Sequence, residues 1–306
     1  MRRRDYAGPD DLLAMQRAVQ RGWTPRRRWH VGDLAWARHA EPGREPGWRT
    51  TLWQDDGDHA VLAWGWAGLP GHLDLHVDPT RPQLAAEVLA WFEQATAGSQ
   101  RSVTVLETEA HLVAALDRAG YRPRAKAPFF QHCLLNLDRS LPAPRLPDGY
   151  RLRAVRPDEA PARAAAHRAA WHPERIGELH APPVDLGDAE SGVTTEGYRA
   201  VMGAWPYRHD LDQVVEAPDG TLAAFALGWL DEANRAGELE PVGTDPRHAR
   251  RGLGSAVSLA CLHALRNAGV RWAVVYPRGD GAYPAARQLY LGLGFRPVAR
   301  TVMFGR

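Results

Sequence analysis

Asp245-Pro-Arg-His-Ala-Arg-Arg-Gly-Leu-Gly-Ser255 is the most informative segment of this 306-residue chain. A strand-like run, 238–244, precedes it, and small or apolar residues recur at helical spacing from Leu253 to Leu265 after it. A glycine-bearing turn that leads into a helix presents unbonded backbone N–H groups and the positive end of the helix dipole. The segment therefore predicts an anion site suited to phosphate, and its three arginines add charge and donors.

Two well-known phosphate-binding classes do not fit this turn. A P-loop NTPase needs Gly-Lys-Ser/Thr, and Lys126 is the only lysine of the chain. A dinucleotide-binding turn needs a small residue where Val257 stands, and an acidic residue at the end of the following strand. Taken alone, the turn leaves two interpretations open, a different kind of phosphate site or a solvated basic turn that only begins a helix.

The residues around the turn favour the phosphate site. The order Pro246, Gly252-x-Gly254, a helix, a strand-like run 273–276 and Ala286-Arg-Gln-Leu-Tyr-Leu-Gly-Leu-Gly-Phe295 resembles the GCN5-related N-acetyltransferase (GNAT) superfamily. Two family features differ here. Ala249 stands where the family usually has Gln or Arg, and the family's Asn ahead of Ala-x-x-Leu-Tyr falls near Tyr283.

The resemblance implies an α/β (α+β) fold of two GNAT-like domains, each with a mixed, splayed central sheet flanked by helices. It also implies acetyl-CoA as co-substrate, with its pyrophosphate on the turn and its pantetheine arm between two strands like an added strand. Pro241 independently favours a bulge in the run before the turn, because a proline within a strand is tolerated at bulges and edges. The residues implied in cofactor binding are Val242, Gly243, Thr244, Arg247, Arg250, Arg251, Gly252, Leu253, Gly254 and Ser255.

Three side chains are candidates for the chemistry of acyl transfer. Glu238 and Glu240 lie two apart on a strand, so both project to one face, and either could be the general base, with Glu238 slightly favoured. The alternative is that they line a polar face or pair with arginines. Tyr290 occupies the family's usual general-acid position, and its alternative role is a buried aromatic. No Cys-x-x-Cys pair occurs, and no metal site is expected.

The chain also contains two similar halves. Leu73-Asp-Leu-His-Val-Asp-Pro79 resembles Leu239-Glu-Pro-Val-Gly-Thr-Asp-Pro246, and Gly120-Tyr-Arg-Pro123 resembles Gly294-Phe-Arg-Pro297. Between the two halves, residues 141–149 contain three prolines and a glycine, a composition typical of a linker. We therefore expect a duplication, with domains at 1–140 and 150–306 joined by a Pro-rich linker, 141–149.

The first half lacks the features that carry the chemistry. Counting from Pro79 puts Ala85 and Glu87 where Gly252 and Gly254 stand, and a carboxylate there would repel a pyrophosphate. Leu116 stands at the position of Tyr290. The first half is therefore expected to be a degenerate, non-catalytic GNAT-like domain, with acetyl-CoA bound only by residues 150–306.

Composition limits the remaining function classes. The chain has 38 Lys+Arg against 36 Asp+Glu, a net charge of +2, which gives no support to nucleic acid as a partner. No apolar run approaches the ~18 residues of a membrane span, and two cysteines cannot build a disulfide framework, so a cytoplasmic protein is expected. The function expected is transfer of acetyl to a primary amine of a small molecule by a monomer or homodimer. The alternatives are a peptide or protein N-terminal acetyltransferase and a non-catalytic acyl-CoA-binding sensor.

Overall fold

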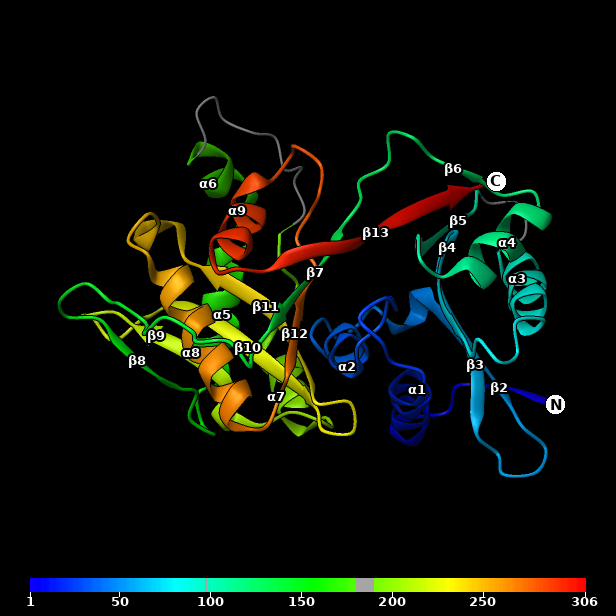
Figure 1. Ribbon diagram of the computed structural model, residues 1–306, viewed down its shortest axis with the longest axis horizontal. Coiled ribbons are helices and arrows are strands. Elements are labelled where there is room, and N and C mark those ends of the chain that lie inside the picture. The colour runs from blue at the N-terminus through cyan, green and yellow to red at the C-terminus, as the bar shows by residue number, and fades with distance from the viewer. Residues whose placement is uncertain (97, 99, 180–189) are drawn as a thin grey trace. The chain divides into compact units, whose positions relative to one another are not determined.

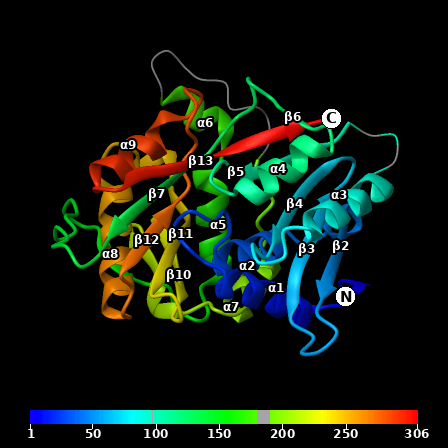
Figure 2. The same cartoon turned by 45° about the vertical axis from the view of Figure 1, so that its right-hand side comes forward.

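The computed structural model describes residues 1–96, 98, 100–179 and 190–306. The chain divides into two compact units, which are described separately (Figures 1 and 2). The first unit comprises Met1–Leu34, Gly43–His132 and Pro297–Arg306. The second comprises Ala35–Pro42 and Cys133–Arg296.

The first unit is a mixed sheet with helices on both faces. Its strands run in the order β1 (Arg2–Asp5), β2 (Trp48–Gln54), β3 (Val61–Gly68), β4 (His72–Val77), β5 (Ser102–Leu106) and β13 (Arg296–Gly305), with β6 (Arg122–Pro123) also on β13. Only β4 and β5 pair in parallel. Its helices are α1 (Pro9–Arg21), α3 (Leu84–Ala95) and α4 (Ala110–Arg118), while α2 (Val31–His39) begins in this unit, and a 3-10 turn, η1 (Glu45–Gly47), precedes β2.

Strand alternation places the two helical layers of this unit. Ala63 and Ala67 of β3 belong to the core with α3 and α4, whereas Trp64 and Trp66 pack with α1. Successive side chains of a strand point to opposite faces, so one strand serves both cores. Gly65 lies between them because a Cβ there would be 2.6 Å from the Trp91 ring of α3.

The second unit repeats this plan. Its strands run in the order β7 (Gln131–Asn136), β12 (Trp272–Val275), β11 (Ala236–Thr244), β10 (Leu222–Asp231), β9 (Asp212–Glu216) and β8 (Arg151–Ala154), and only β11 and β12 pair in parallel. Its helices are α5 (Ala160–Ala170), α6 (Pro173–Glu178), α7 (Thr195–Gly203), α8 (Leu253–Asn267) and α9 (Pro284–Gly292), with 3-10 turns η2 (His209–Leu211) and η3 (Pro246–His248). The helix predicted after the glycine turn is α8.

Two cores flank the second sheet. Leu253, Val257, Cys261 and Leu265, spaced four apart along α8, pack against buried residues of β10 and β11. On the other face, α5 and α7 pack against Leu227 and Trp229 of β10. The splayed, mixed sheet flanked by helices that the sequence predicted is therefore present in both units.

Each unit takes one strand from the other half of the sequence. β13, at the end of the chain, pairs antiparallel with β5, with Thr301 opposite Leu106. β7 pairs antiparallel with β12, with Leu134 opposite Val274. The compact units therefore differ from 1–140 and 150–306 by these exchanged strands and by Ala35–Pro42, which belongs to the second unit. Within the Pro-rich segment, 141–147 has no regular structure.

The two halves match closely at the segment that follows their last helices. Gly120 and Gly294 both have positive φ, +82° and +99°. The N–H of Tyr121 donates to the carbonyl of Leu116 (3.0 Å), and the N–H of Phe295 donates to that of Tyr290 (3.1 Å). Leu116 is therefore the structural counterpart of Tyr290.

The expected position of Glu87 was wrong. α3 begins at Leu84, five residues after Pro79, whereas α8 begins at Leu253, seven residues after Pro246. The turn of the first unit is therefore two residues shorter, and Ala85 rather than Glu87 holds the place of Gly254 in its helix. The first turn still has no glycine, since Gln83 precedes α3 with φ −61°, where Gly252 precedes α8 with φ +78°.

Candidate functional site

The second sheet opens between β11 and β12. Their parallel ladder ends with Glu238 opposite Val274, while β11 continues to Thr244 paired only with β10. Ala226 lies opposite Val242 and Gly228 opposite Leu239, so Glu240 and Pro241 together face one residue of β10. This is the bulge that Pro241 predicted. An extended ligand could add to the edge of β11 beyond the bulge as a further strand does.

The glycine turn lies directly after this open edge. Gly252, which directly precedes α8, has a left-handed backbone (φ +78°), a conformation that is unfavourable for a residue with a Cβ. Ala256 makes the first bond of the helix, to the carbonyl of Gly252. The N–H groups of Leu253, Gly254 and Ser255 therefore belong to the first turn, where a helix has no internal acceptors and favours an anion.

Gly254 is held close to its neighbours. A Cβ at this position would lie 3.2 Å from Oγ1 of Thr244 and 3.7 Å from Cδ2 of Leu289. Thr244 at the end of β11 and Leu289 of α9 thus both lie close to the first turn of α8. Glycine is favoured at position 254 because a larger residue would crowd these two side chains.

The three arginines of the turn have different surroundings. Arg247 forms a 2.6 Å ion pair with buried Asp245, which also accepts its backbone N–H. Burial alone would raise the pKa of Asp245, but the bonds from Arg247 outweigh it and lower that pKa. Arg250 donates to the carbonyl of Leu179, and Arg251 is exposed beside the start of α8. The structure thus balances the charge of Arg247 inside the turn, a pairing that residue spacing did not indicate.

Tyr290 is the buried residue of α9. Its side chain is 7% exposed, and its ring lies 5.7 Å from that of Phe295. Burial first, and then the negative charge of Glu240, raise the pKa of the Tyr290 hydroxyl well above its ordinary value. Tyr290 is therefore a protonated hydroxyl at neutral pH.

The two candidate carboxylates differ in setting. Glu238 is fully buried, whereas Glu240 is half-buried and its charge acts on Tyr290. Because the bulge begins at Glu240, regular alternation does not fix both side chains to one face. Of these two carboxylates, Glu240 is therefore the one whose charge raises the pKa of the Tyr290 hydroxyl.

Sequence reasoning did not predict the hydrogen bond that Trp229 makes to the bulge. The indole N–H of Trp229 donates to the carbonyl of Glu240 (2.6 Å), and Trp229 is fully buried in β10. Its ring lies 6.3 Å from that of Tyr207. A tryptophan within an apolar run is usually core, and its N–H needs an acceptor when buried, but the sequence alone does not say which acceptor.

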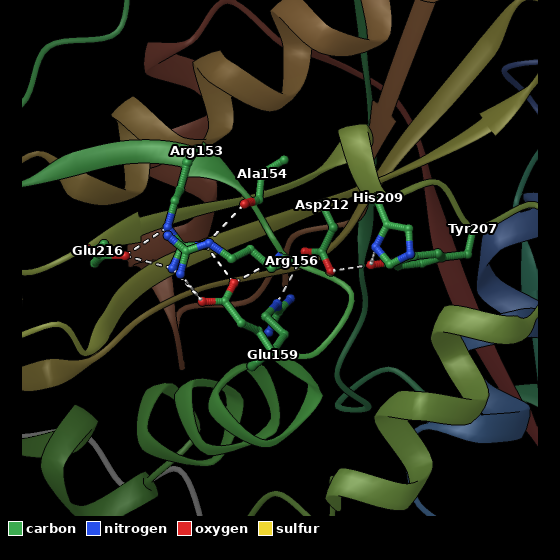
Figure 3. A network of polar contacts seen from close by, with 9 residues as sticks. Arg153, Ala154, Arg156, Glu159, Tyr207, His209, Asp212 and Glu216 are labelled. Atoms are coloured by element: carbon green, nitrogen blue, oxygen red, sulfur yellow. Dashed lines mark hydrogen bonds and ion pairs between the residues drawn. The ribbon is translucent and has the colours of Figure 1, made fainter.

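A buried polar network supports the strands on this side of the sheet. Asp212 of β9 accepts a hydrogen bond from Tyr207 (3.1 Å) and is paired with Arg163 of α5 (3.2 Å). Burial first, and then the charge of Asp212, raise the pKa of Tyr207. Figure 3 shows the Tyr207–Asp212 contact. The network joins α5 to β9, beside β10.

An ion-pair cluster in the same view joins two strands to the start of α5. The guanidinium of Arg153 in β8 donates to both oxygens of Glu159 (2.6 and 2.7 Å) and to Glu216 of β9 (2.8 Å) (Figure 3). Bidentate arginine–carboxylate pairs are among the stronger charge-assisted hydrogen bonds. The cluster fixes β8 and β9 to the residue that precedes α5.

Three further features bear on the kind of site this chain can hold. Across 1–96, 98, 100–179 and 190–306, no group of His, Cys, Asp and Glu could hold a metal ion. Within those ranges no helix is long and apolar enough to cross a membrane. Cys133 and Cys261 are free and buried, and burial raises the pKa of the Cys133 thiol to about 11.

A splayed mixed sheet, a bulged strand and a glycine turn that begins a helix beside it define the fold of the GCN5-related N-acetyltransferases. The second unit has all three features, whereas the first has the mixed sheet with a shorter turn that lacks glycine.

Comparison with known proteins agrees with this class. Residues 186–295 match the model of the Acetyltransferase (GNAT) family. The solved structure of a tandem GNAT protein from the clavulanic acid biosynthesis pathway matches with a TM-score of 0.64 at 20% identity, covering 100% of this chain and 98% of that one. Residues 186–295 therefore match the GNAT family, and the chain as a whole has the fold of a tandem GNAT protein.

Curated relatives match over a shorter region. A mycothiol acetyltransferase from Saccharomonospora viridis is 29% identical over 55% of this chain and 53% of its own length. One from Actinosynnema mirum is 32% identical over 50% of this chain and 46% of its own length. The chain thus spans about half the length of the curated relatives it matches.

Proposed function

We propose that this protein is an N-acetyltransferase that moves the acetyl group of acetyl-CoA to a primary amine of a small molecule. The observation that carries the proposal is the arrangement of the second unit, where the open edge of β11, the Gly252 turn and Tyr290 adjoin one another. The family match over 186–295 and the names of the curated relatives support acyl transfer.

The cofactor would bind along β11 and at the start of α8. The backbone of Val242, Gly243 and Thr244 would bond the pantetheine arm as a strand does. The first-turn N–H groups of Leu253, Gly254 and Ser255, with Arg251, would hold the pyrophosphate. Arg247 and Arg250 would act with them, Arg247 mainly by holding the turn through Asp245.

The chemistry needs one base and one acid. Glu240 would take a proton from the acceptor ammonium, with Glu238 as the alternative base, and the free amine nitrogen would attack the thioester carbon. As the carbon–sulfur bond breaks, the Tyr290 hydroxyl would give its proton to the leaving thiolate. Its raised pKa keeps it protonated, as an acid requires.

Two other functions are possible alternatives to small-molecule N-acetylation. The acceptor could be the N-terminal amine of a peptide or protein, or the chain could bind acyl-CoA without turnover. We also propose a cytoplasmic location, on the ground that its two cysteines are buried thiols, and a monomer or homodimer without nucleic acid as partner.

Substitution of the proposed acid tests the function. Tyr290→Phe is expected to lower kcat about 100-fold, because general acid catalysis contributes that much or more, while the Kd of acetyl-CoA changes less than about 2-fold. The measurement is CoA release with a panel of small amines and of peptides with free N-termini. Tyr121→Phe, which alters a buried tyrosine of the first unit, is the control and should leave kcat unchanged.

The same assay separates the alternatives. Turnover confined to peptides would replace the small-molecule acceptor by a peptide, and binding without turnover of any amine would favour the sensor. Full activity of Tyr290→Phe would remove the hydroxyl from the mechanism. Of the two carboxylate variants, Glu240→Gln is expected to lower kcat more than Glu238→Gln.

The pH profile provides a further check. Tyr290 would act in its protonated form, and the pKa of its hydroxyl is raised. The hydroxyl therefore loses its proton, and with it the proposed role as acid, only at a pH above the ordinary tyrosine pKa of about 10. We therefore expect no alkaline fall of kcat from this group below about pH 10. An alkaline limb near pH 8 that disappears in Tyr290→Phe would contradict the assignment.

A further inference from the structure

The sheet of the first unit opens at the same place as that of the second. β4 and β5 pair in parallel only through His72 opposite Ser102 and Leu73 opposite Val103. Beyond Leu73, β4 continues to Val77 beside β3 alone. The first unit therefore has an opening between β4 and β5 that corresponds to the one between β11 and β12.

Side chains of the segment between α1 and α2 reach both strands at this opening. The indole N–H of Trp29 donates to the carbonyl of Leu75 on β4 (2.8 Å). The guanidinium of Arg28 donates to the carbonyl of Thr104 on β5 and forms a 2.7 Å ion pair with Asp74 on β4. Arg28 therefore joins the two strands where their own ladder has ended.

A third side chain reaches the same edge from α4. Nε2 of His111 lies 3.1 Å from the carbonyl oxygen of Val77, and since a carbonyl can only accept, this nitrogen carries the proton. Leu75 and Val77 stand four and two residues before Pro79, as Val242 and Thr244 stand before Pro246. The carbonyls bonded in the first unit are thus the counterparts of those assigned to the pantetheine arm in the second.

The filling side chains are themselves held in place. The Arg28 guanidinium carbon lies 4.2 Å from the centroid of the Trp29 ring. The Trp29 ring in turn lies 5.4 Å from that of Trp64, which is fully buried in β3. Displacing Trp29 would therefore break its hydrogen bond to Leu75 and, at the same time, its contacts with Arg28 and Trp64.

We propose that Arg28, Trp29 and His111 occupy in the first unit the slot that the pantetheine arm of acyl-CoA takes in the second, and so close the first unit to this ligand. The comparison of the two edges rests on the proposed function of the second unit. This closure does not depend on the shorter, glycine-free turn before α3. Even if that turn were changed so that it could bind pyrophosphate, the side chains of Arg28, Trp29 and His111 would still fill the slot beside it.

Hydrogen exchange of tryptophan indole N–H groups tests the closure directly. The full-length protein is labelled with ¹⁵N-tryptophan, and Trp29→Phe identifies the Trp29 signal. Trp171, whose side chain is exposed, provides the fast reference. The Trp29 indole is expected to exchange at least on the order of 100-fold more slowly than that of Trp171, with and without saturating CoA.

Two results would overturn the proposal. One is a Trp29 exchange rate within a few-fold of that of Trp171, which would show that its bond to Leu75 is not maintained. The other is loss of Trp29 protection when CoA is added, which would show that the ligand enters the first unit. If CoA binds nowhere in the chain, the proposed function fails, whereas Trp29 protection without ligand still decides whether the slot is filled.

Discussion

Gly252 illustrates how a single backbone conformation shapes the candidate site. Its φ of +78° lets the chain turn from η3 into α8 so that the first-turn N–H groups follow the open edge of β11. A residue with a Cβ would be strained in this conformation although nothing lies within 4 Å of the added atom. The requirement is therefore one of conformation and not of space.

Replacing this glycine should cost stability. Gly252→Ala is expected to lower the free energy of unfolding by about 1–2 kcal/mol, and the Tm by about 2–4 °C per kcal/mol, and to weaken acetyl-CoA binding. Gly203→Ala is the control, because Gly203 ends α7 without positive φ and has nothing within 4 Å of its added Cβ. The control should be neutral or stabilising. Equal Tm values for the two variants would contradict the requirement for a left-handed residue.

Some residues of the site could be predicted from the sequence and others could not. The glycine turn and the bulge at Pro241 are local, because they depend on the conformations that glycine and proline allow. The pairing of Arg247 with Asp245 and the bond from Trp229 to Glu240 depend on which side chains the fold brings together. The effect of Glu240 on Tyr290 likewise joins two residues fifty apart in sequence.

At the scale of elements, the exchanged strands are the main departure from the sequence-based description. A repeat in the sequence predicts two similar halves, but antiparallel pairing does not require the last strand of a half to join its own sheet. β13 carries Phe304 into the core of the first unit, where it is buried with residues of α3 and β5. Hydrophobic pattern alone does not distinguish the two possible partners of such a strand.

Truncating that side chain tests the exchange. Phe304→Ala is expected to destabilise the first unit by about 3–5 kcal/mol, the usual cost for a buried phenylalanine. Hydrogen exchange measured by mass spectrometry should show lost protection in β5, with β10 and β11 of the second unit retained. Val298→Ala, in the same strand but exposed, serves as the control and should change neither. Loss of protection in β12 instead of β5 would show that β13 belongs to the other sheet.

The shorter turn before α3 shows a second limit of sequence reasoning. Counting from Pro79 assumed turns of equal length in the two halves, and the structure shows that α3 begins two residues earlier than that count requires. Helix boundaries are poorly determined by pattern, whereas the match of Leu116 with Tyr290 is determined by the Gly-aromatic pair that follows both helices. The structure therefore places Leu116 in the first half where the second half has Tyr290, the residue proposed as the acid.

At the scale of the whole molecule, one fold occurs twice with different contents at its opening. In the second unit the open edge of β11 is followed by a glycine turn and lies near Tyr290. In the first unit Trp29, Arg28 and His111 bond the strands at the opening, and the turn is shorter. If only the second unit binds acetyl-CoA, as we propose, the stoichiometry of the ligand should be one molecule per chain.

Isothermal titration of the full chain with acetyl-CoA tests the central claim most directly. We predict one bound molecule per chain, with binding abolished by Gly254→Glu, since a side chain there would meet Thr244 and bring a negative charge to the phosphate position. Thermal melting of the variant would verify that it is folded. Two molecules per chain, no binding by the native protein, or binding retained by folded Gly254→Glu would contradict the account.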